Sequence, residues 1–391
     1  MTSPPAPALP DTVTTRFHTL DRPFRMRSGE VLESVTLAYE VYGELNEQRD
    51  NALLVFHALT GSQHAAGLNP GVEGVGARWI DEMQIGWWNG FVGPGKALDT
   101  DRFAVICVNY LGGCYGSTGP ASIDPGTGKP YGSTFPRMSL VDVVDPQVQL
   151  LDDLGIDRLH AVIGSSIGGL MCLSFATRYP DRVKSVIPIA SGLEVTALQR
   201  IHILEQCLAI EVDQAFAGGD YYPGPGPVRG MALARMVAHK SFVSLSAMEE
   251  RARAEVVERD EIGGYVRIVN PLESYMWHQG ARFVERFDAN SYLRIMEMWQ
   301  TFDLVQQAGE NGLESTLGRC RDQRFMVFSI DSDVCYYPDE QQDMASALDK
   351  AGVPVRRVTV HSEKGHDAFL LEPELFAPHL ADTLEHGWSR W

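Results

Sequence analysis

The chain has 391 residues, of which 33 are basic and 51 acidic, so its formal net charge is −18. Its content of 44% hydrophobic and 21% charged residues is typical of a globular protein and excludes a largely disordered chain. The length exceeds the roughly 250–300 residues of one hydrophobic core, so we expect a core with an insertion or a second small domain. The acidic balance argues against nucleic acid or an anionic membrane as a partner.

Residues 1–11 are polar and rich in proline, without the apolar stretch of a secretion signal. No uncharged apolar run reaches the roughly 18 residues that a membrane span requires. We therefore expect a cytoplasmic protein that does not enter a membrane. The six cysteines are scattered without CxxC spacing, which argues against structural zinc and against a disulfide framework.

Taken in chain order, the patterns predict strands that alternate with helices. Residues 24–42 alternate apolar and polar side chains about residues 28–30 (SGE), which predicts an N-terminal β-hairpin. Short apolar runs then predict strands buried on both faces at residues 52–56, 103–108, 159–163, 185–190, 325–330 and 355–360. Helical patterns lie between several of them, at residues 140–154, 168–179 and 340–351. This alternation predicts an α/β fold with a parallel, doubly wound sheet.

The alternation stops between about residues 193 and 318. Helical patterns follow one another there without convincing strands, at residues 195–216, 231–242, 246–259 and 290–302. We expect a helical lid, residues 193–318, inserted over the strand ends of a core made of residues 1–192 and 319–391. The loop-rich stretch 61–99 contains Trp87 and Trp88, and these aromatic residues favour an ordered loop.

The strongest local motif is GSSIG at residues 164–168, directly between a predicted strand and a predicted helix. A strand-to-helix turn this sharp strains its central residue and needs small residues two positions to either side. Ser166 is therefore a candidate nucleophile, exposed at the edge of the sheet. It would also lie at the positive end of the following helix, where the Ile167 N–H can stabilise an oxyanion.

A nucleophilic serine on such a turn is followed in the chain by an acid and then by a histidine. Asp331 and Asp333 come after one predicted strand, and His366 comes after the next. We expect His366 to take the Ser166 proton, with one of the two aspartates holding the imidazole, while His361 is a competing histidine. The second oxyanion donor should follow an earlier strand, and the Leu59 N–H is the candidate.

Five segments resemble the homoserine O-acyltransferases of the α/β-hydrolase superfamily, specifically those of the homoserine O-acetyltransferase type. They are residues 57–61 (HALTG), 93–96 (GPGK), 109–120 (NYLGGCYGSTGP), 287–292 (FDANSY) and 365–370 (GHDAFL). The similarity extends over residues 17–385. It implies an α/β-hydrolase fold with a mostly parallel sheet and an inserted helical lid. It also implies a homodimer built through the lid.

The resemblance further implies a ping-pong reaction that makes O-acetyl-L-homoserine for methionine biosynthesis. Ser166 would take an acetyl group from acetyl-CoA, which is a substrate, and no permanently bound cofactor or metal is expected. The family pattern favours Asp333 over Asp331, assigns Asp367 to the acceptor's amino group, and matches Tyr275 to an acceptor-site tyrosine. The family's Phe-Gly-Arg element is degraded here to residues 250–254 (ERARA), which leaves Arg253 or Arg251 for the acceptor's carboxylate.

Other functions remain open at this point. The same chemistry could use succinyl-CoA as the donor or L-serine as the acceptor. An esterase or thioesterase would pass the acyl group to water. A catalytically silent binding protein is disfavoured because it would not need Ser166, Asp333 and His366 together.

Overall fold

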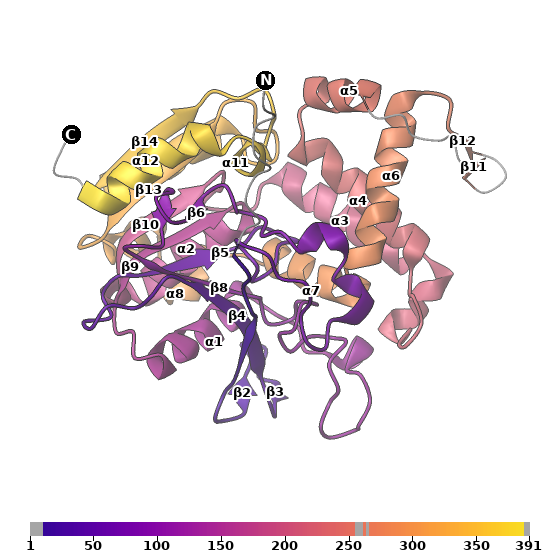
Figure 1. Ribbon diagram of the computed structural model, residues 1–391, viewed down its shortest axis with the longest axis horizontal. Helices are drawn as coiled ribbons and strands as arrows, with labels where there is room; N and C mark the ends of the chain where they lie inside the picture. The colour runs from indigo at the N-terminus through magenta and orange to yellow at the C-terminus, as the bar shows by residue number, and fades with distance from the viewer. Residues whose placement is uncertain (1–10, 255–260, 263–265, 387–391) are drawn as a thin grey trace, which may run out of the picture.

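The computed structural model describes residues 11–254, 261–262 and 266–386 (Figure 1). Its main sheet has the strand order β1-β4-β8-β5-β9-β10-β13-β14. The strands are β1 (Arg16–Thr19), β4 (Thr36–Tyr42), β8 (Ala104–Val108), β5 (Ala52–Phe56), β9 (Leu159–Ser165), β10 (Val183–Ile189), β13 (Arg324–Ile330) and β14 (Val355–Val360). Neighbours from β8 to β14 run parallel, whereas β4 is antiparallel to both β1 and β8.

The predicted parallel α/β sheet is thus confirmed, with one difference at its edge. Strands β5 and β8 are buried at every position, as their unbroken apolar runs predict. Strand β14 is only partly buried, since it has a single neighbour in the sheet, β13. The prediction that all six runs are buried on both faces is therefore wrong for β14.

The N-terminal hairpin has different partners from those predicted. Only the short strands β2 (Phe24–Arg25) and β3 (Val31–Leu32) pair across the predicted turn. The long strand β4 instead pairs with β1, in a register that puts Phe17 opposite Ala38. Strand β1 is mostly exposed, so it lacks the alternating apolar pattern by which a half-buried strand is recognised.

Helices cover both faces of the sheet. The helices of the core are α1 (Leu140–Asp153), α2 (Ile167–Arg178), α10 (Pro338–Lys350), α11 (Ala368–Leu371) and α12 (Pro373–His386). Helix α2 packs on β9 and β10, and α10 packs on β13 and β14. Apolar side chains of α12, including Phe376 and Leu380, are buried together with residues of β5 and β13.

The long loop after β5 packs against the body of the protein. Trp88 is 1% exposed, and its indole N–H donates to the Phe369 carbonyl at 3.1 Å. Trp87 stacks on Trp88 and donates to the Ser62 carbonyl at 2.9 Å. The prediction that the two tryptophans order this loop is confirmed. Two short paired strands lie within it, β6 (Val92–Gly93) and β7 (Leu98–Asp99).

Between β10 and β13 the chain is mainly helical, as predicted. The helices are α3 (Ala197–Glu211), α4 (Val228–Phe242), α5 (Leu245–Ala254), α6 (Pro271–Arg286), α7 (Ala289–Gln300), α8 (Leu304–Ala308) and α9 (Leu313–Gly318). In Figure 1, α3 to α6 stand together on the right, across the molecule from α12 and β14. The residue patterns gave no indication of α6 or of the short strands β11 (Glu261–Ile262) and β12 (Val266–Arg267).

Some expectations lie outside the described residues or stay untested. Residues 255–259 of the predicted helix 246–259 are not among those described, nor is the proline-rich start up to residue 10. The division into core and lid at residues 193 and 318 stays a prediction. Over the ranges that the structure describes, no helix is long and apolar enough to cross a membrane. The six cysteines are free thiols.

Candidate active site

Ser166 stands on a strained turn between β9 and α2. Its backbone has φ 57° and ψ −124°, and its N–H donates to the Ile189 carbonyl at 2.9 Å. A Cβ atom on Gly164 would lie 2.2 Å from the Gly168 carbonyl oxygen, and one on Gly168 would lie 2.4 Å from the Phe56 oxygen. Only glycine fits at these two positions, which explains the spacing of the GSSIG motif.

His366 and Asp333 meet beside this turn. Asp333 follows β13 and His366 follows β14, so both come to the sheet edge at which β9 ends. The distance from His366 Nδ1 to Asp333 Oδ2 is 2.7 Å, and both side chains are buried. The other oxygen of Asp333 accepts the N–H groups of Cys335 and Tyr336 at 2.8 and 2.9 Å. These bonds fix the carboxylate and, through it, the imidazole.

The hydrogen bond with Asp333 also sets the protonation of His366. Because the carboxylate accepts, Nδ1 carries the proton of the neutral ring and Nε2 carries the lone pair. Nε2 is buried and has no hydrogen-bond partner among the described residues. Burial of the ring disfavours its charged form, but the charge and hydrogen bond of Asp333 outweigh burial and raise the pKa of His366 above its usual 6.5.

The competing aspartate and histidine pair with each other on the surface. His361 is 83% exposed, and its Nδ1 lies 2.8 Å from Asp331 Oδ2. Asp331 also accepts the Ser362 N–H at 3.0 Å. The geometry therefore joins His366 to Asp333 and leaves Asp331 and His361 outside the site.

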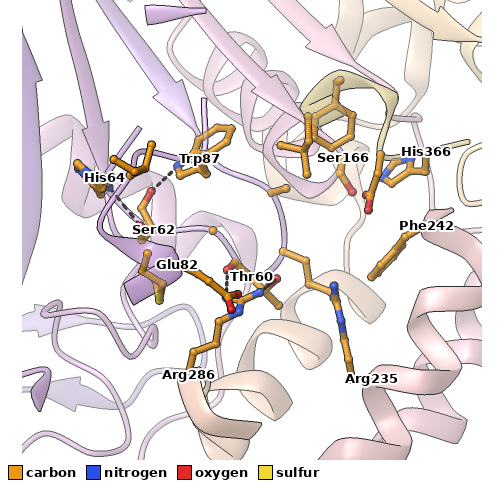
Figure 2. A pocket seen from close by; sticks show the side chains of 18 residues that line it. Thr60, Ser62, His64, Glu82, Trp87, Ser166, Arg235, Phe242, Arg286 and His366 are labelled. Carbon is orange, nitrogen blue, oxygen red and sulfur yellow. Dashed lines mark hydrogen bonds between the residues drawn. The ribbon is translucent and has the colours of Figure 1, made fainter. Parts of the chain in front are cut away.

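A cavity of about 260 Å³ opens in front of Ser166. Figure 2 shows Ser166 and His366 at one side of it, with Arg235 and Arg286 facing them. Leu59, the candidate oxyanion donor, lines the same cavity, and Ile167, the other candidate, is the first residue of α2. In the described part of the chain, no group of three or more His, Cys, Asp or Glu side chains is arranged to hold a metal ion.

The cavity carries charges of both signs. Asp367 lines it beside His366, and Arg235 reaches it from α4. The Arg235 guanidinium lies 5.4 Å from the centre of the Phe242 ring and 5.0 Å from that of Phe283. It makes no hydrogen bond or ion pair with any residue that the structure describes. Burial and the charge of Arg286 lower the pKa of Arg235, so a bound anion would relieve an unfavourable concentration of positive charge.

Two residues expected to bind the acceptor do not reach the cavity. Arg253 has a side chain that is 75% exposed, and it pairs with Glu249 on the same helix at 3.3 Å. The expectation that Arg253 lies in the site is wrong, because α5 turns this position toward solvent. Tyr275 is buried, and its hydroxyl lies 3.0 Å from His239 Nε2, but it does not line the cavity.

Sequence reasoning missed Arg286, the second arginine of the cavity. It is the last residue of α6, immediately before the 287–292 segment that carries part of the family resemblance. An arginine in the last turn of a helix is usually explained by its interaction with the helix dipole. Its position next to that segment is the one signal that could have singled it out.

Comparisons with known proteins identify the class. Residues 51–373 match a family model described as the alpha/beta hydrolase fold. The parallel sheet and the serine on its strand-to-helix turn are the features of that class. Among solved structures, an esterase, E22, superposes with a TM-score of 0.84 at 26% identity, covering 95% of this chain and 100% of that one.

The more similar relatives share one name. A protein of Rhodospirillum rubrum named homoserine O-acetyltransferase is 42% identical, covering 94% of this chain and 90% of the relative. One of Pelagibacter ubique with the same name is 39% identical, covering 95% and 97%. The solved homoserine O-acetyltransferase of Bacillus anthracis has a TM-score of 0.84 at 26% identity, covering 96% and 98%. The chain therefore belongs to the homoserine O-acetyltransferase family of the α/β hydrolases.

Proposed function

We infer that this protein is an acyl-CoA-dependent O-acyltransferase that moves an acetyl group to the hydroxyl of L-homoserine through an acyl-Ser166 intermediate. The observation that carries this inference is the pair of opposite charges beside the nucleophile. Arg235 and Asp367 line the same small cavity as Ser166. A free amino acid carries a carboxylate and an ammonium group, and these charges match that pair.

The acceptor's carboxylate would pair with Arg235, whose guanidinium donors are not used by any described residue. Its ammonium group would pair with Asp367. Burial raises the pKa of Asp367 above its usual value, against the opposing charges of His366 and Arg235. A bound ammonium group would add a further positive charge and would therefore favour the ionised form of the Asp367 carboxylate. The side-chain hydroxyl would then extend toward Ser166.

The reaction would proceed in two halves. His366 Nε2 takes the Ser166 proton as the serine oxygen attacks the thioester carbonyl of acetyl-CoA, and then gives this proton to the CoA sulfur, which leaves as the thiol. In the second half, His366 takes the proton of the homoserine hydroxyl as its oxygen attacks the acetyl-serine, and then gives the proton to the departing Ser166 oxygen. In both halves, the N–H groups of Leu59 and Ile167 would stabilise the oxyanion, and Asp333 would stabilise the protonated His366.

This chemistry needs no permanently bound cofactor, since the acyl donor arrives as a substrate. Transfer to an amino acid must be faster than hydrolysis by water, so the site has to be narrow and covered. The cavity is walled on one side by residues of α4 and α6. With acetyl-CoA as the donor, the reaction would take place in the cytoplasm, and its product would serve methionine biosynthesis, as the family resemblance implies.

An esterase is the second candidate, because the structure of esterase E22 superposes as well as the Bacillus anthracis acetyltransferase does. Such an enzyme would share the serine chemistry of the first half and use water in the second. The amino-acid charge match at Arg235 and Asp367 favours transfer.

Acyl donors and acceptors can be tested together. Acetyl-CoA and succinyl-CoA would each be mixed with homoserine, serine or water, and CoA release and product mass would be measured. We expect rapid release with acetyl-CoA and homoserine, and a loss of at least about a thousandfold in Ser166→Ala. CoA release that is equally fast without an amino acid would reject the transferase and support the esterase.

The pH dependence of transfer should reflect His366. The ring must be neutral to accept a proton, so the rate should fall as the pH drops through a midpoint above 6.5. Asp333→Asn removes the charge that raises this pKa and leaves burial, which lowers it. We expect its acidic midpoint to shift to lower pH, together with a drop in kcat on the order of 10³–10⁴-fold. An unchanged midpoint in pH–rate profiles would contradict the proposed pairing.

Asp367 should affect the acceptor more than the donor. We expect Asp367→Asn to raise the KM of homoserine about tenfold or more through loss of a charged hydrogen bond, with a smaller change in the KM of acetyl-CoA. Asp331→Asn is the matched control, because Asp331 pairs with His361 on the surface, and its constants should stay near those of the wild type. Equal effects of Asp367→Asn on both substrates in steady-state kinetics would reject the assignment.

We further propose a homodimer formed through the inserted helices. Helix α3 and the residue after it expose an apolar row, Leu198, Ile201, Leu204, Leu208 and Val212, each at least 39% exposed. A mostly apolar groove of about 650 Å³ lies between α4, α5 and α6. A second copy would bury both surfaces.

Sedimentation should give the dimer mass, and Ile201→Glu with Leu208→Glu should shift it toward the monomer. If the wild-type protein sediments as a monomer, the proposed interface is wrong.

A further inference from the structure

Arg286 joins the inserted helices to the loop that carries the candidate oxyanion donor. It ends α6, and its Nη1 donates to the Thr60 carbonyl oxygen at 3.0 Å. Its Nη2 lies 3.4 Å from the Thr60 hydroxyl. Figure 2 shows this contact on the wall of the cavity that faces Ser166. Thr60 directly follows Leu59, so the arginine acts on the backbone next to the proposed donor.

Tyr115 holds the Arg286 guanidinium in this orientation. The tyrosine is fully buried, and its hydroxyl donates to the Arg286 carbonyl at 2.9 Å and accepts from Arg286 Nη1 at 3.1 Å. The guanidinium also lies 5.1 Å from the centre of the Phe283 ring. Arg286 thus differs from Arg235: its Nη1 and Nη2 contact Thr60 and Tyr115, whereas the guanidinium of Arg235 has no hydrogen-bond partner among the described residues.

Two peptide units connect Arg286 to the Leu59 N–H. The Thr60 carbonyl and the Gly61 N–H belong to one planar unit, and the Gly61 N–H donates to the Ala58 carbonyl at 3.0 Å. The Ala58 carbonyl and the Leu59 N–H belong to the second unit, which this hydrogen bond joins to the first. Since each unit is planar, fixing its oxygen fixes the direction of its N–H. Hydrogen bonds arranged in such a chain also polarise one another.

His57 supports the same carbonyl from the other side. Its Nδ1 lies 2.7 Å from the Ala58 oxygen, and a carbonyl can only accept, so Nδ1 carries the proton. Burial lowers the pKa of His57 to about 4, which keeps the ring neutral in this form. The ring stacks on Tyr110 with their centres 3.6 Å apart, and the Tyr110 hydroxyl donates to the His57 carbonyl.

We propose that Arg286 is a positioning residue that acts through the Thr60–Gly61 and Ala58–Leu59 peptide units to aim the Leu59 N–H at the oxyanion. This role rests on the proposed function, which assigns the oxyanion to Leu59. It links two segments that carry the family resemblance, residues 57–61 and 109–120, through the residue that directly precedes the third, 287–292. It also couples the inserted helices to the geometry of the reacting carbonyl.

A neutral ester separates this role from the binding of a charged substrate. With p-nitrophenyl acetate, the Ser166 oxygen bonds to the acetyl carbon, p-nitrophenolate leaves, and His366 takes the serine proton. This substrate carries no group that needs an arginine. In stopped-flow measurements, we expect Arg286→Met to slow acylation by about tenfold or more with little change in the ester's KM, and Arg286→Lys to recover part of the rate.

Arg294→Met is the matched control. Arg294 on α7 also donates to a backbone carbonyl of the core, that of Phe135 at 2.6 Å, but it does not line the cavity. We expect its acylation rate to stay within about twofold of the wild type. If Arg286→Met does not fold, Tyr115→Phe decides the question, because it removes the hydroxyl that orients Arg286. It should slow acylation in the same direction by a smaller factor.

The outcomes distinguish the two proposals. Folded Arg286→Met could be acylated by the neutral ester at the wild-type rate and show a raised KM for acetyl-CoA or homoserine. That result would overturn the positioning role and make Arg286 a substrate-binding residue. If only Tyr115→Phe folds, acylation of this variant at the wild-type rate would also overturn the positioning role. A wild-type protein with no Ser166-dependent release of p-nitrophenolate would instead overturn the proposed function, and the positioning role with it.

Discussion

The backbone turn at Ser166 is the constraint on which the rest of the site depends. A non-glycine residue at φ 57° and ψ −124° costs on the order of 1–3 kcal/mol, and the surrounding structure must hold it there. The bond from the Ser166 N–H to Ile189 and the close packing at Gly164 and Gly168 do so. The hydroxyl is thereby fixed where β9 ends. Because β5, β13 and β14 run parallel to β9, the loops that follow them, carrying Leu59, Asp333 and His366, reach the same edge.

The charged groups around the cavity fall into two kinds. Some are committed to the protein: Asp333 is held by two backbone N–H groups and orients His366, and Arg286 is held by Tyr115 and contacts Thr60. Arg235 and Asp367 also line the cavity, and the guanidinium of Arg235 makes no hydrogen bond or ion pair with a described residue. An esterase and an acetyltransferase superpose on this chain equally well, so the fold alone does not distinguish their chemistry. In the proposed reaction, Arg235 and Asp367 are the groups that would select the acceptor.

The sequence predicted the parts of the structure that follow from local chemistry. The apolar run at residues 52–56 indicated a buried strand, and the glycines of residues 164–168 indicated the turn at Ser166. Residue patterns alone could not choose between Asp331 and Asp333, because both follow β13 and only the course of the loop brings Asp333 to His366. The family likeness made that choice, and the geometry agrees with it.

The failures concern residues whose orientation depends on tertiary packing. Helix α5 turns Arg253 to solvent, while α4 and α6 bring Arg235 and Arg286 to the cavity. The sequence does not distinguish these three arginines, because each is a charged residue on an amphipathic helix. The pairing of β1 with β4 was hidden for a similar reason. Strand β1 is mostly exposed, so its sequence shows no alternation.

The central claim is that the acyl group passes through Ser166, and intact-protein mass spectrometry tests it most directly. The protein would be mixed with acetyl-CoA without an acceptor, quenched in acid, and digested to locate the modification. We expect a mass increase of one acetyl group on the peptide that contains Ser166, and this increase should disappear when homoserine is added before the quench. An acetyl group on another residue, or homoserine-dependent CoA release from a protein that is never acetylated, would contradict the claim.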